Sequence, residues 1–158
     1  TKALTDAGLS FTPLFEARPH VFVNHHHPLA GRASIKPEEL EDYPRYSFEQ
    51  GANNSFFFAE EPLSQFPHRQ NITYYDRGTL TILLANHNGY TISTGVMSGE
   101  MGQDICSIPL EVDETMTVGF VYHAERPLSP LAQRYIEKLR EGIEANPTVT
   151  TYFPRAHE

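Results

Sequence analysis

The sequence lacks several features that would assign a protein quickly to a class. Its 158 residues include one cysteine and no tryptophan, and no apolar run is long enough to cross a membrane. A single cysteine excludes an internal disulfide framework and fits a reducing compartment such as the cytoplasm. Because Cys106 lies in a short alternating apolar stretch, we expect a buried thiol rather than a nucleophile.

The chain also has too little positive charge to bind nucleic acid by itself. It carries 12 Lys and Arg residues against 20 Asp and Glu residues, which gives a formal net charge of -8. Phosphate binding needs a basic footprint, and no run of Lys and Arg provides one. The hydrophobic content of 39% is enough for the core of one medium domain or two small lobes.

Motifs for catalysis and metal binding are scarce. The sequence has neither a glycine-rich phosphate loop nor a Gly-x-Ser-x-Gly elbow. The consecutive residues His25, His26 and His27 have no further ligand at metal spacing, so a solvated loop is favoured over a metal site. Glu49 and Asp76 would form an acid/base pair if their loops met, but paired loop carboxylates often arise by chance. We therefore predict no enzyme activity, no metal and no cofactor.

The middle of the chain alternates short apolar strands with amphipathic helices. Strands are predicted at 45–49, 71–75 and 90–93, and helices at 53–66 and 79–87. This order is typical of parallel strands joined by right-handed helical crossovers. The pattern predicts an α/β fold with a doubly wound sheet.

Polar side chains follow each of these three strands. Because the carboxyl ends of parallel strands lie at one edge of a sheet, the loops at 49–55, 76–79 and 93–96 are expected to come together. Each polar residue by itself is better explained as a cap or turn, and it is the grouping that favours a site. The predicted ligand-binding residues are Ser47, Glu49, Gln50, Asn53, Asn54, Ser55, Thr79, Ser93 and Thr94.

The residues of this predicted site favour two different kinds of ligand group. Hydroxyls, amides and a helix amino end suit an anionic or polar group. Glu49 disfavours an anion unless it pairs with Arg77 or is protonated, and it would favour an amine instead. An amino-acid-like ligand would use both features.

The segments that flank the middle part are also patterned. Two extended runs at 9–12 and 20–23 are interrupted by Pro13 and Pro19, which favours an edge or crossover strand. A short helix is predicted to begin at Pro37, before the strand at 45–49.

Toward the carboxyl end, a strand is predicted at 116–122 and the clearest helix begins at Ser129-Pro130. We expect its apolar stripe to be core, and residues 147–158 to form a tail. The stripe comprises Leu131, Tyr135, Ile136, Leu139 and Ile143.

In their order and spacing, these stretches resemble the effector-binding domain of LysR-type transcriptional regulators. The stretches that carry the resemblance are Pro13 to Val23, His27 to Ala30 with the Glu39-Leu40 helix, Leu84 to Ser93 and Leu128 to Ile136. The resemblance implies one lobe of a periplasmic-binding-protein-like (type II) fold with a doubly wound mixed sheet. It also implies that a carboxyl-terminal strand and helix belong to the other lobe.

The resemblance further implies how the chain is divided. Residues 1–15 would end the first lobe and 16–115 would form the second, with an effector held between the lobes. Residues 116–146 would return to the first lobe, and 147–158 would follow as the tail. Much of the first lobe and an amino-terminal winged helix-turn-helix have no counterpart in this sequence. The apolar faces of the strand and helix in 116–146 therefore favour self-association.

The function implied is that of the regulatory fragment of a LysR-type transcriptional regulator. It would sense a small polar or anionic metabolite and couple it to DNA binding through the missing domain. The implied partners are the small-molecule effector and further copies of the chain, as a homodimer or homotetramer, in the cytoplasm and without membrane contact. The alternative is a lobe of a periplasmic-type solute-binding protein of a transport system, which the residues before Thr1 would distinguish.

Overall fold

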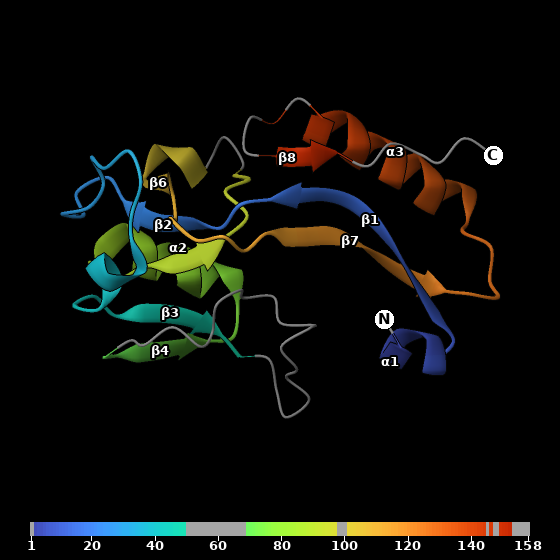
Figure 1. The fold of residues 1–158 in the computed structure, drawn as a ribbon, viewed down its shortest axis with the longest axis horizontal. Coiled ribbons are helices and arrows are strands. Elements are labelled where there is room, and N and C mark those ends of the chain that lie inside the picture. The colour runs from blue at the N-terminus through green and yellow to red at the C-terminus, as the bar shows by residue number, and fades with distance from the viewer. Residues whose placement is uncertain (1, 50–68, 98–100, 145, 147–148, 153–158) are drawn as a thin grey trace. The chain divides into compact units, whose positions relative to one another are not determined.

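The chain divides into two compact units, drawn as a ribbon in Figure 1. The computed structural model describes residues 2–49, 69–97, 101–144, 146 and 149–152. Unit 1 comprises Thr1–Ala17 and Thr115–Glu158, and unit 2 comprises the intervening Arg18–Glu114. The backbone therefore passes from one unit to the other twice.

Unit 2 is built on a mixed sheet. Its strands are β2 (His20–Asn24), β3 (Arg45–Phe48), β4 (Asn71–Tyr74), β5 (Thr91–Ser93) and β6 (Ile105–Pro109). Strand β2 pairs with both β5 and β6 in antiparallel fashion, whereas β3 and β4 are parallel. An isolated parallel bridge between Arg45 and Tyr90 joins the two groups, so β3, β4 and β5 run in one direction. This confirms the predicted mixed α/β sheet.

Helix α2 (Arg77–Asn86) follows β4 and begins at a strong local signal. The carboxylate of Asp76 accepts hydrogen bonds from the backbone N–H of Thr79 at 2.8 Å and from its hydroxyl at 2.7 Å. Such a cap satisfies a donor that the first helical turn leaves without a partner. Among the described residues of unit 2, the other helical pieces are two short 3-10 turns, η1 (Pro37–Leu40) and η2 (Met101–Gln103).

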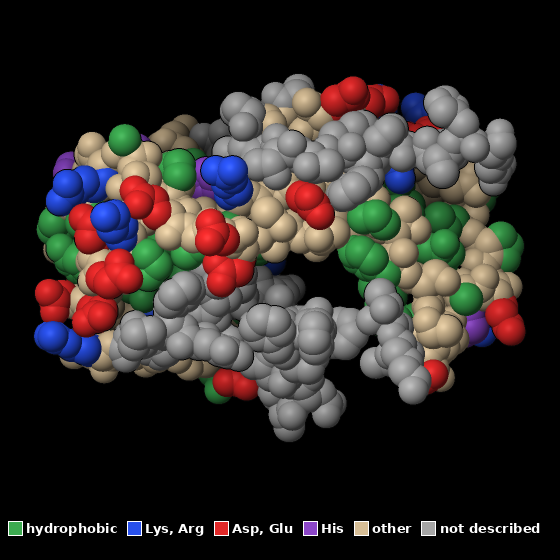
Figure 2. All heavy atoms as spheres, viewed as in Figure 1, with side chains coloured by type: hydrophobic (Ala, Val, Ile, Leu, Met, Phe, Trp, Pro, Cys, Tyr) green, Lys and Arg blue, Asp and Glu red, His purple; other side chains and the backbone are tan. Residues whose placement is uncertain are grey.

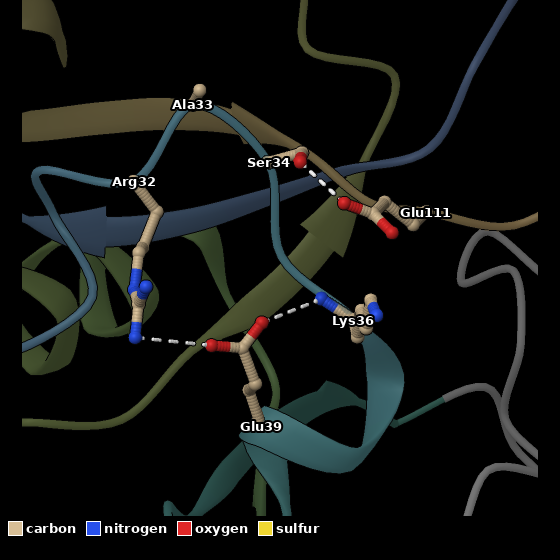
Figure 3. Close-up of a pocket in the computed structure, with 6 residues that line it drawn as sticks. All are labelled: Arg32, Ala33, Ser34, Lys36, Glu39 and Glu111. Carbon is tan, nitrogen blue, oxygen red and sulfur yellow. Dashed lines mark hydrogen bonds and ion pairs between the residues drawn. The ribbon is translucent and has the colours of Figure 1, made fainter.

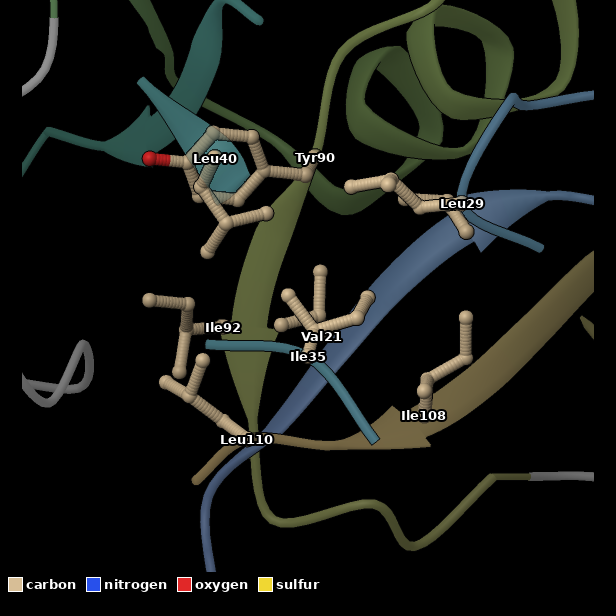
Figure 4. Close-up of a cluster of buried hydrophobic side chains, with 9 residues drawn as sticks. Val21, Leu29, Ile35, Leu40, Tyr90, Ile92, Ile108 and Leu110 are labelled. Atoms are coloured by element: carbon tan, nitrogen blue, oxygen red, sulfur yellow. The ribbon is translucent and has the colours of Figure 1, made fainter. Parts of the chain in front are cut away.

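Two hydrophobic clusters cover the two faces of the unit 2 sheet. Because successive side chains of a strand point to opposite faces, Val21 and Val23 enter one cluster and Phe22 enters the other. The first cluster includes Ile35, Ile92 and Ile108, whose side chains converge in Figure 4. The second holds the buried side of α2 through Leu80 and Leu84. Burial of each such side chain contributes roughly 1.5–3 kcal/mol.

Unit 1 is a small antiparallel sheet accompanied by helices. Its elements are α1 (Lys2–Asp6), β1 (Leu9–Ala17), β7 (Met116–His123), α3 (Pro130–Glu144) and β8 (Val149–Tyr152). Strand β1 lies between β7 and β8, and its register with β7 shifts between Pro13 and Phe15. A proline cannot donate to the ladder, which explains an irregularity at this point. Apolar side chains are visible over β1 and β7 in Figure 2.

Two predictions for the carboxyl-terminal part are wrong. The range expected to be a tail contains β8, which pairs with β1 near Phe15; its β-branched run is a strand signal that needed a distant partner to become one. The stripe of α3 was expected to be core, yet none of the described residues of this helix is buried. Leu131 is 79% exposed and Tyr135 is 64% exposed, whereas Ile136, Leu139 and Ile143 are half-buried.

Two sequence expectations about single residues need correction. The histidine loop is only partly solvated: His25 and His26 are exposed, but His27 is 3% exposed. Its ring lies against Tyr43 with the centroids 4.4 Å apart. Cys106 is half-buried rather than buried, and its thiol donates to the carbonyl oxygen of Val23 at 3.5 Å.

Candidate functional site

One edge of the unit 2 sheet collects the ends of all its strands. Strands β3, β4 and β5 end there, and β2 begins there because it runs opposite to β5. The register places His20 opposite both Ser93 and Pro109, so β6 also ends at this edge. We call it the carboxyl edge and define it as Phe48 and Glu49, Tyr74 to Asp76, Ser93 to Gly95, and His20. Ligands of open α/β sheets bind preferentially at such an edge.

Glu49 lies at the carboxyl edge, and Ser47 lies just inside it. The backbone N–H of Glu49 donates to the carbonyl oxygen of Tyr74 at 2.9 Å, which ties the ends of β3 and β4 together. The Arg45–Tyr90 bridge aligns Phe48 with Ser93 and Ser47 with the residue before it, so Ser47 and Ser93 point to opposite faces. The hydroxyl of Ser47 donates to Oδ1 of Asn71.

Thr79 belongs to the cap of α2. Its hydrogen bonds to Asp76 occupy both its backbone N–H and its hydroxyl proton. The same bonds, first from the Thr79 side chain and then from its backbone, hold the pKa of Asp76 below its usual value. Asp76 is therefore charged at neutral pH, and its carboxylate occupies the position at the amino end of α2 where an anion would bind.

The turn that follows β5 lies against His20. Ser93 and Thr94 are half-buried, and the hydroxyl oxygen of Thr94 accepts a hydrogen bond from the N–H of Val96 at 3.3 Å. Gly95 has a φ of +80°, and a Cβ built on it would lie 2.7 Å from Cγ and Nδ1 of His20. Glycine is therefore required here for both its conformation and its close approach to the ring.

His20 is the residue of this edge that the sequence did not single out. Its side chain is 9% exposed, and its Nδ1 lies 2.8 Å from the carbonyl oxygen of Arg18. In the sequence it is one of several single histidines, and its contact with Gly95 joins distant parts of the chain. The signal in the sequence was Gly95, two residues after the strand predicted at 90–93.

The structure thus brings together part of the predicted site. Glu49, Ser93 and Thr94 lie at the carboxyl edge, Thr79 lies in the adjoining helix cap, and Ser47 faces the opposite side of the sheet. The remaining predicted residues lie outside the described residues, as does the helix expected at 53–66. They are Gln50, Asn53, Asn54 and Ser55.

A hollow of about 430 Å³ lies on unit 2 near η1 (Figure 3). Arg32 and Glu39 form an ion pair across it at 3.4 Å, and Ser34 donates to a carboxylate oxygen of Glu111 at 2.5 Å. The backbone N–H of Lys36 also donates to Glu39. These charged groups largely satisfy one another, which makes the hollow a weaker candidate than the carboxyl edge.

The part of the chain that the structure describes contains neither a metal-ligand cluster nor a membrane span. No group of three or more His, Cys, Asp or Glu side chains among these residues has the arrangement of a metal site. No helix among them is both long enough and apolar enough to cross a bilayer. In Figure 2, acidic and basic side chains are mixed over the visible face of unit 2.

The chain is similar to a family of regulator domains. The profile of the LysR substrate binding domain matches residues 1–144. Among solved structures, HinK, a LysR family transcriptional regulator from Pseudomonas aeruginosa, superposes with a TM-score of 0.63 at 16% identity, over 87% of this chain and 49% of HinK. The chain thus spans about half the length of HinK. No protein of curated function is a significant match.

Two solved effector domains show the same likeness. The effector binding domain of QuiR in complex with shikimate has a TM-score of 0.60 and 17% identity, over 89% of this chain and 68% of that domain. The regulatory domain of MetR, a LysR family regulator from N. meningitidis, has a TM-score of 0.62 and 14% identity, over 93% of this chain and 71% of that domain. At these identities the likeness establishes the fold, which is of the periplasmic-binding-protein-like type II.

Proposed function

The chain belongs to the LysR substrate binding domain family, and on that basis we propose that it is the effector-binding part of a cytoplasmic transcriptional regulator. It binds a small polar metabolite at the carboxyl edge of unit 2. Binding is coupled to DNA recognition by another part of the regulator, because the present sequence has a net charge of -8 and no run of Lys and Arg for phosphate. The family is one of regulators, so the proposal includes no catalytic step.

The observation that supports this placement is the convergence of strand ends in unit 2. Glu49, Ser93 and Thr94 come from two different strands and lie at one edge, where the backbone also leaves for unit 1. A molecule bound at this edge lies beside the start of β2, the segment of unit 2 that follows one crossing of the backbone between the units. Differential binding to two arrangements of such segments is what shifts a conformational equilibrium.

The division of the chain follows the same proposal. Unit 2 corresponds to the second lobe of the effector domain, and unit 1 holds a part of the first lobe. The exposed apolar side chains of α3, Leu131 and Tyr135, support association with further polypeptide, and we propose a homodimer or homotetramer.

The charges at the carboxyl edge narrow the class of effector. Asp76 already caps α2 and carries a negative charge, and Glu49 lies at the end of the neighbouring strand. An anionic group is therefore disfavoured on this side of the edge. Hydroxyl groups of Ser93 and Thr94 lie on the other side, where a carboxylate or a hydroxyl would find donors. Since the similar QuiR domain was solved in complex with shikimate, hydroxylated carboxylic acids are the first ligands to test.

Calorimetric titration with shikimate tests the proposal. Ser93→Ala removes one hydroxyl from the edge and is expected to weaken binding about five- to tenfold, which corresponds to about 1 kcal/mol for a lost hydrogen bond. Thr81→Ala is the matched control, because the Thr81 hydroxyl donates to the carbonyl oxygen of Arg77 on the exposed side of α2. Equal affinity of the two variants for the acid would place the site elsewhere.

A further inference from the structure

We propose that His20 contacts the effector and that its Nε2 accepts a hydrogen bond from a hydroxyl group of that molecule. The inference rests on the proposed function, since it concerns the same edge of unit 2. It adds a residue that the sequence pattern did not assign to the site. It also adds a chemical requirement, namely that the effector carries a hydroxyl.

The hydrogen bond to the carbonyl oxygen of Arg18 determines the tautomer of the neutral His20 ring. A carbonyl oxygen has only lone pairs, so the contact of 2.8 Å between Nδ1 of His20 and the oxygen of Arg18 requires the proton on Nδ1. The other nitrogen of the neutral imidazole, Nε2, is then a bare acceptor. The backbone thus determines that His20 presents an acceptor rather than a donor.

This acceptor has no partner among the described residues, although the ring is nine-tenths buried. The only hydrogen bond of the His20 side chain there is the one made by Nδ1, and the side chain is 9% exposed. Several polar side-chain atoms are completely buried and have no hydrogen-bond partner, but Nε2 of His20 is not one of them. The small exposed part of the ring therefore includes Nε2, and a ligand at the edge can reach it.

The ring is held in place by its surroundings. On one side the Arg18 carbonyl binds Nδ1, and on another the backbone of Gly95 lies so close that a Cβ would approach the ring to 2.7 Å. A group that is immobilised before binding loses little entropy when the ligand arrives. A fixed ring with one unused acceptor is a selective contact for a hydroxyl.

The neighbouring groups complete a complementary set. Ser93 is the strand partner of His20, and the Thr94 oxygen accepts from Val96, which leaves its own proton to donate. The edge therefore offers hydroxyl donors beside an imidazole acceptor. A carboxylate accepts from the former and a hydroxyl donates to the latter, so the set selects a hydroxylated carboxylic acid over the same acid without the hydroxyl.

The test compares acids that differ only in hydroxyl groups. Shikimate and 1-cyclohexene-1-carboxylate form one pair, and malate and succinate form a second. Calorimetry on the full chain is expected to show about tenfold tighter binding of the hydroxylated member of at least one pair. His20→Asn retains a donor at the position of Nδ1 but has no group at Nε2, so this preference is expected to disappear. His20→Gln places an amide oxygen near Nε2 and is expected to restore part of it.

The outcomes separate the two levels of the proposal. His26→Asn is the control, since His26 is exposed and follows β2 at the opposite edge of the sheet; it is expected to bind like the wild type. The inference about His20 is wrong if His20→Asn keeps the preference for the hydroxylated acid. It is also wrong if the wild type shows no such preference while Ser93→Ala still weakens binding. In both cases the proposed function stands. If no acid binds, the proposed function fails with it. Should His20→Asn not fold by circular dichroism, a wild-type preference in His20→Gln confirms the acceptor and its loss refutes it.

Discussion

Replacement of Asn24 by alanine is expected to destabilise unit 2 by about 3 kcal/mol. Asn24 is 5% exposed, and its side-chain amide donates to the carbonyl oxygens of Leu84 and His87, both at 3.0 Å. Its Oδ1 accepts from the backbone N–H of His26 at 2.9 Å. Each bond contributes about 1 kcal/mol, so loss of the three gives the stated magnitude.

The physical reason lies in the end of α2. The last carbonyl groups of a helix have no partner within the helix, and Asn24 supplies one to this end from the neighbouring β2. Without it, the carbonyl oxygen of Leu84 loses its side-chain partner in a buried setting, and the carbonyl oxygen of His87 and the N–H of His26 lose theirs in a partly buried one. The helix end and the sheet would then separate more easily.

Urea unfolding followed by circular dichroism at 222 nm measures this effect, because the chain has no tryptophan to report by fluorescence. Asn86→Ala is the matched control: its amide donates to the carbonyl oxygen of Ile82 at 2.9 Å on the exposed side of the same helix, and its effect is expected to stay within about 0.5 kcal/mol. A loss below about 1 kcal/mol for Asn24→Ala would show that these bonds do not secure α2 to the sheet.

Two further predictions concern Gly95 and His27. Gly95→Ala is expected to lower the free energy of unfolding by about 1–2 kcal/mol, since the φ of Gly95 is +80°, and to weaken shikimate binding by displacing His20. Gly102→Ala is the control, because Gly102 has open space around it. Equal melting temperatures of the two variants would refute the requirement for glycine at position 95. Burial lowers the pKa of His27 below 6.5, against a smaller opposite effect of the Asn88 backbone. The unfolded state therefore binds more protons, so stability is complete above pH 6.5 and falls as the pH drops through the lowered value. Urea unfolding at pH 7.5 and 5.5 is expected to show this loss in the wild type and a smaller one in His27→Gln, and identical losses would exclude His27 as the cause.

Local signals in the sequence were sufficient for much of unit 2. Asp76 followed by Thr79 is a cap that depends only on neighbouring residues, and the helix begins there. The strands at Arg45–Phe48 and Asn71–Tyr74 have short runs of strand-forming residues bounded by turns. These elements and their parallel direction place Glu49 and the residues after β5 at one edge.

The rest depends on contacts between distant residues. Pairing of β8 with β1, and the exposure of Leu131 on α3, depend on how much sheet is present in unit 1. Similarly, the contact between Gly95 and His20 exists only once β2 and β5 are paired. Sequence periodicity contains no information on such partners, which is why His20 was missed and the α3 stripe was misassigned.

The face of the sheet on which Ser47 lies could be predicted only in part from the sequence. Alternation along β3 correctly separates Ser47 from its buried neighbour Tyr46. It does not tell which face carries the other polar residues of the site, since that depends on the register with β5 through the Arg45–Tyr90 bridge. The register sets Ser47 apart from Ser93.

Amide chemical-shift mapping during a titration with shikimate distinguishes the carboxyl edge from the charged hollow as the binding site. The largest shifts are expected at the amides of Glu49, Ser93, Thr94 and Gly95, which belong to the carboxyl edge. Shifts concentrated instead at Arg32, Ser34 and Glu39, which line the charged hollow of Figure 3, would contradict this expectation.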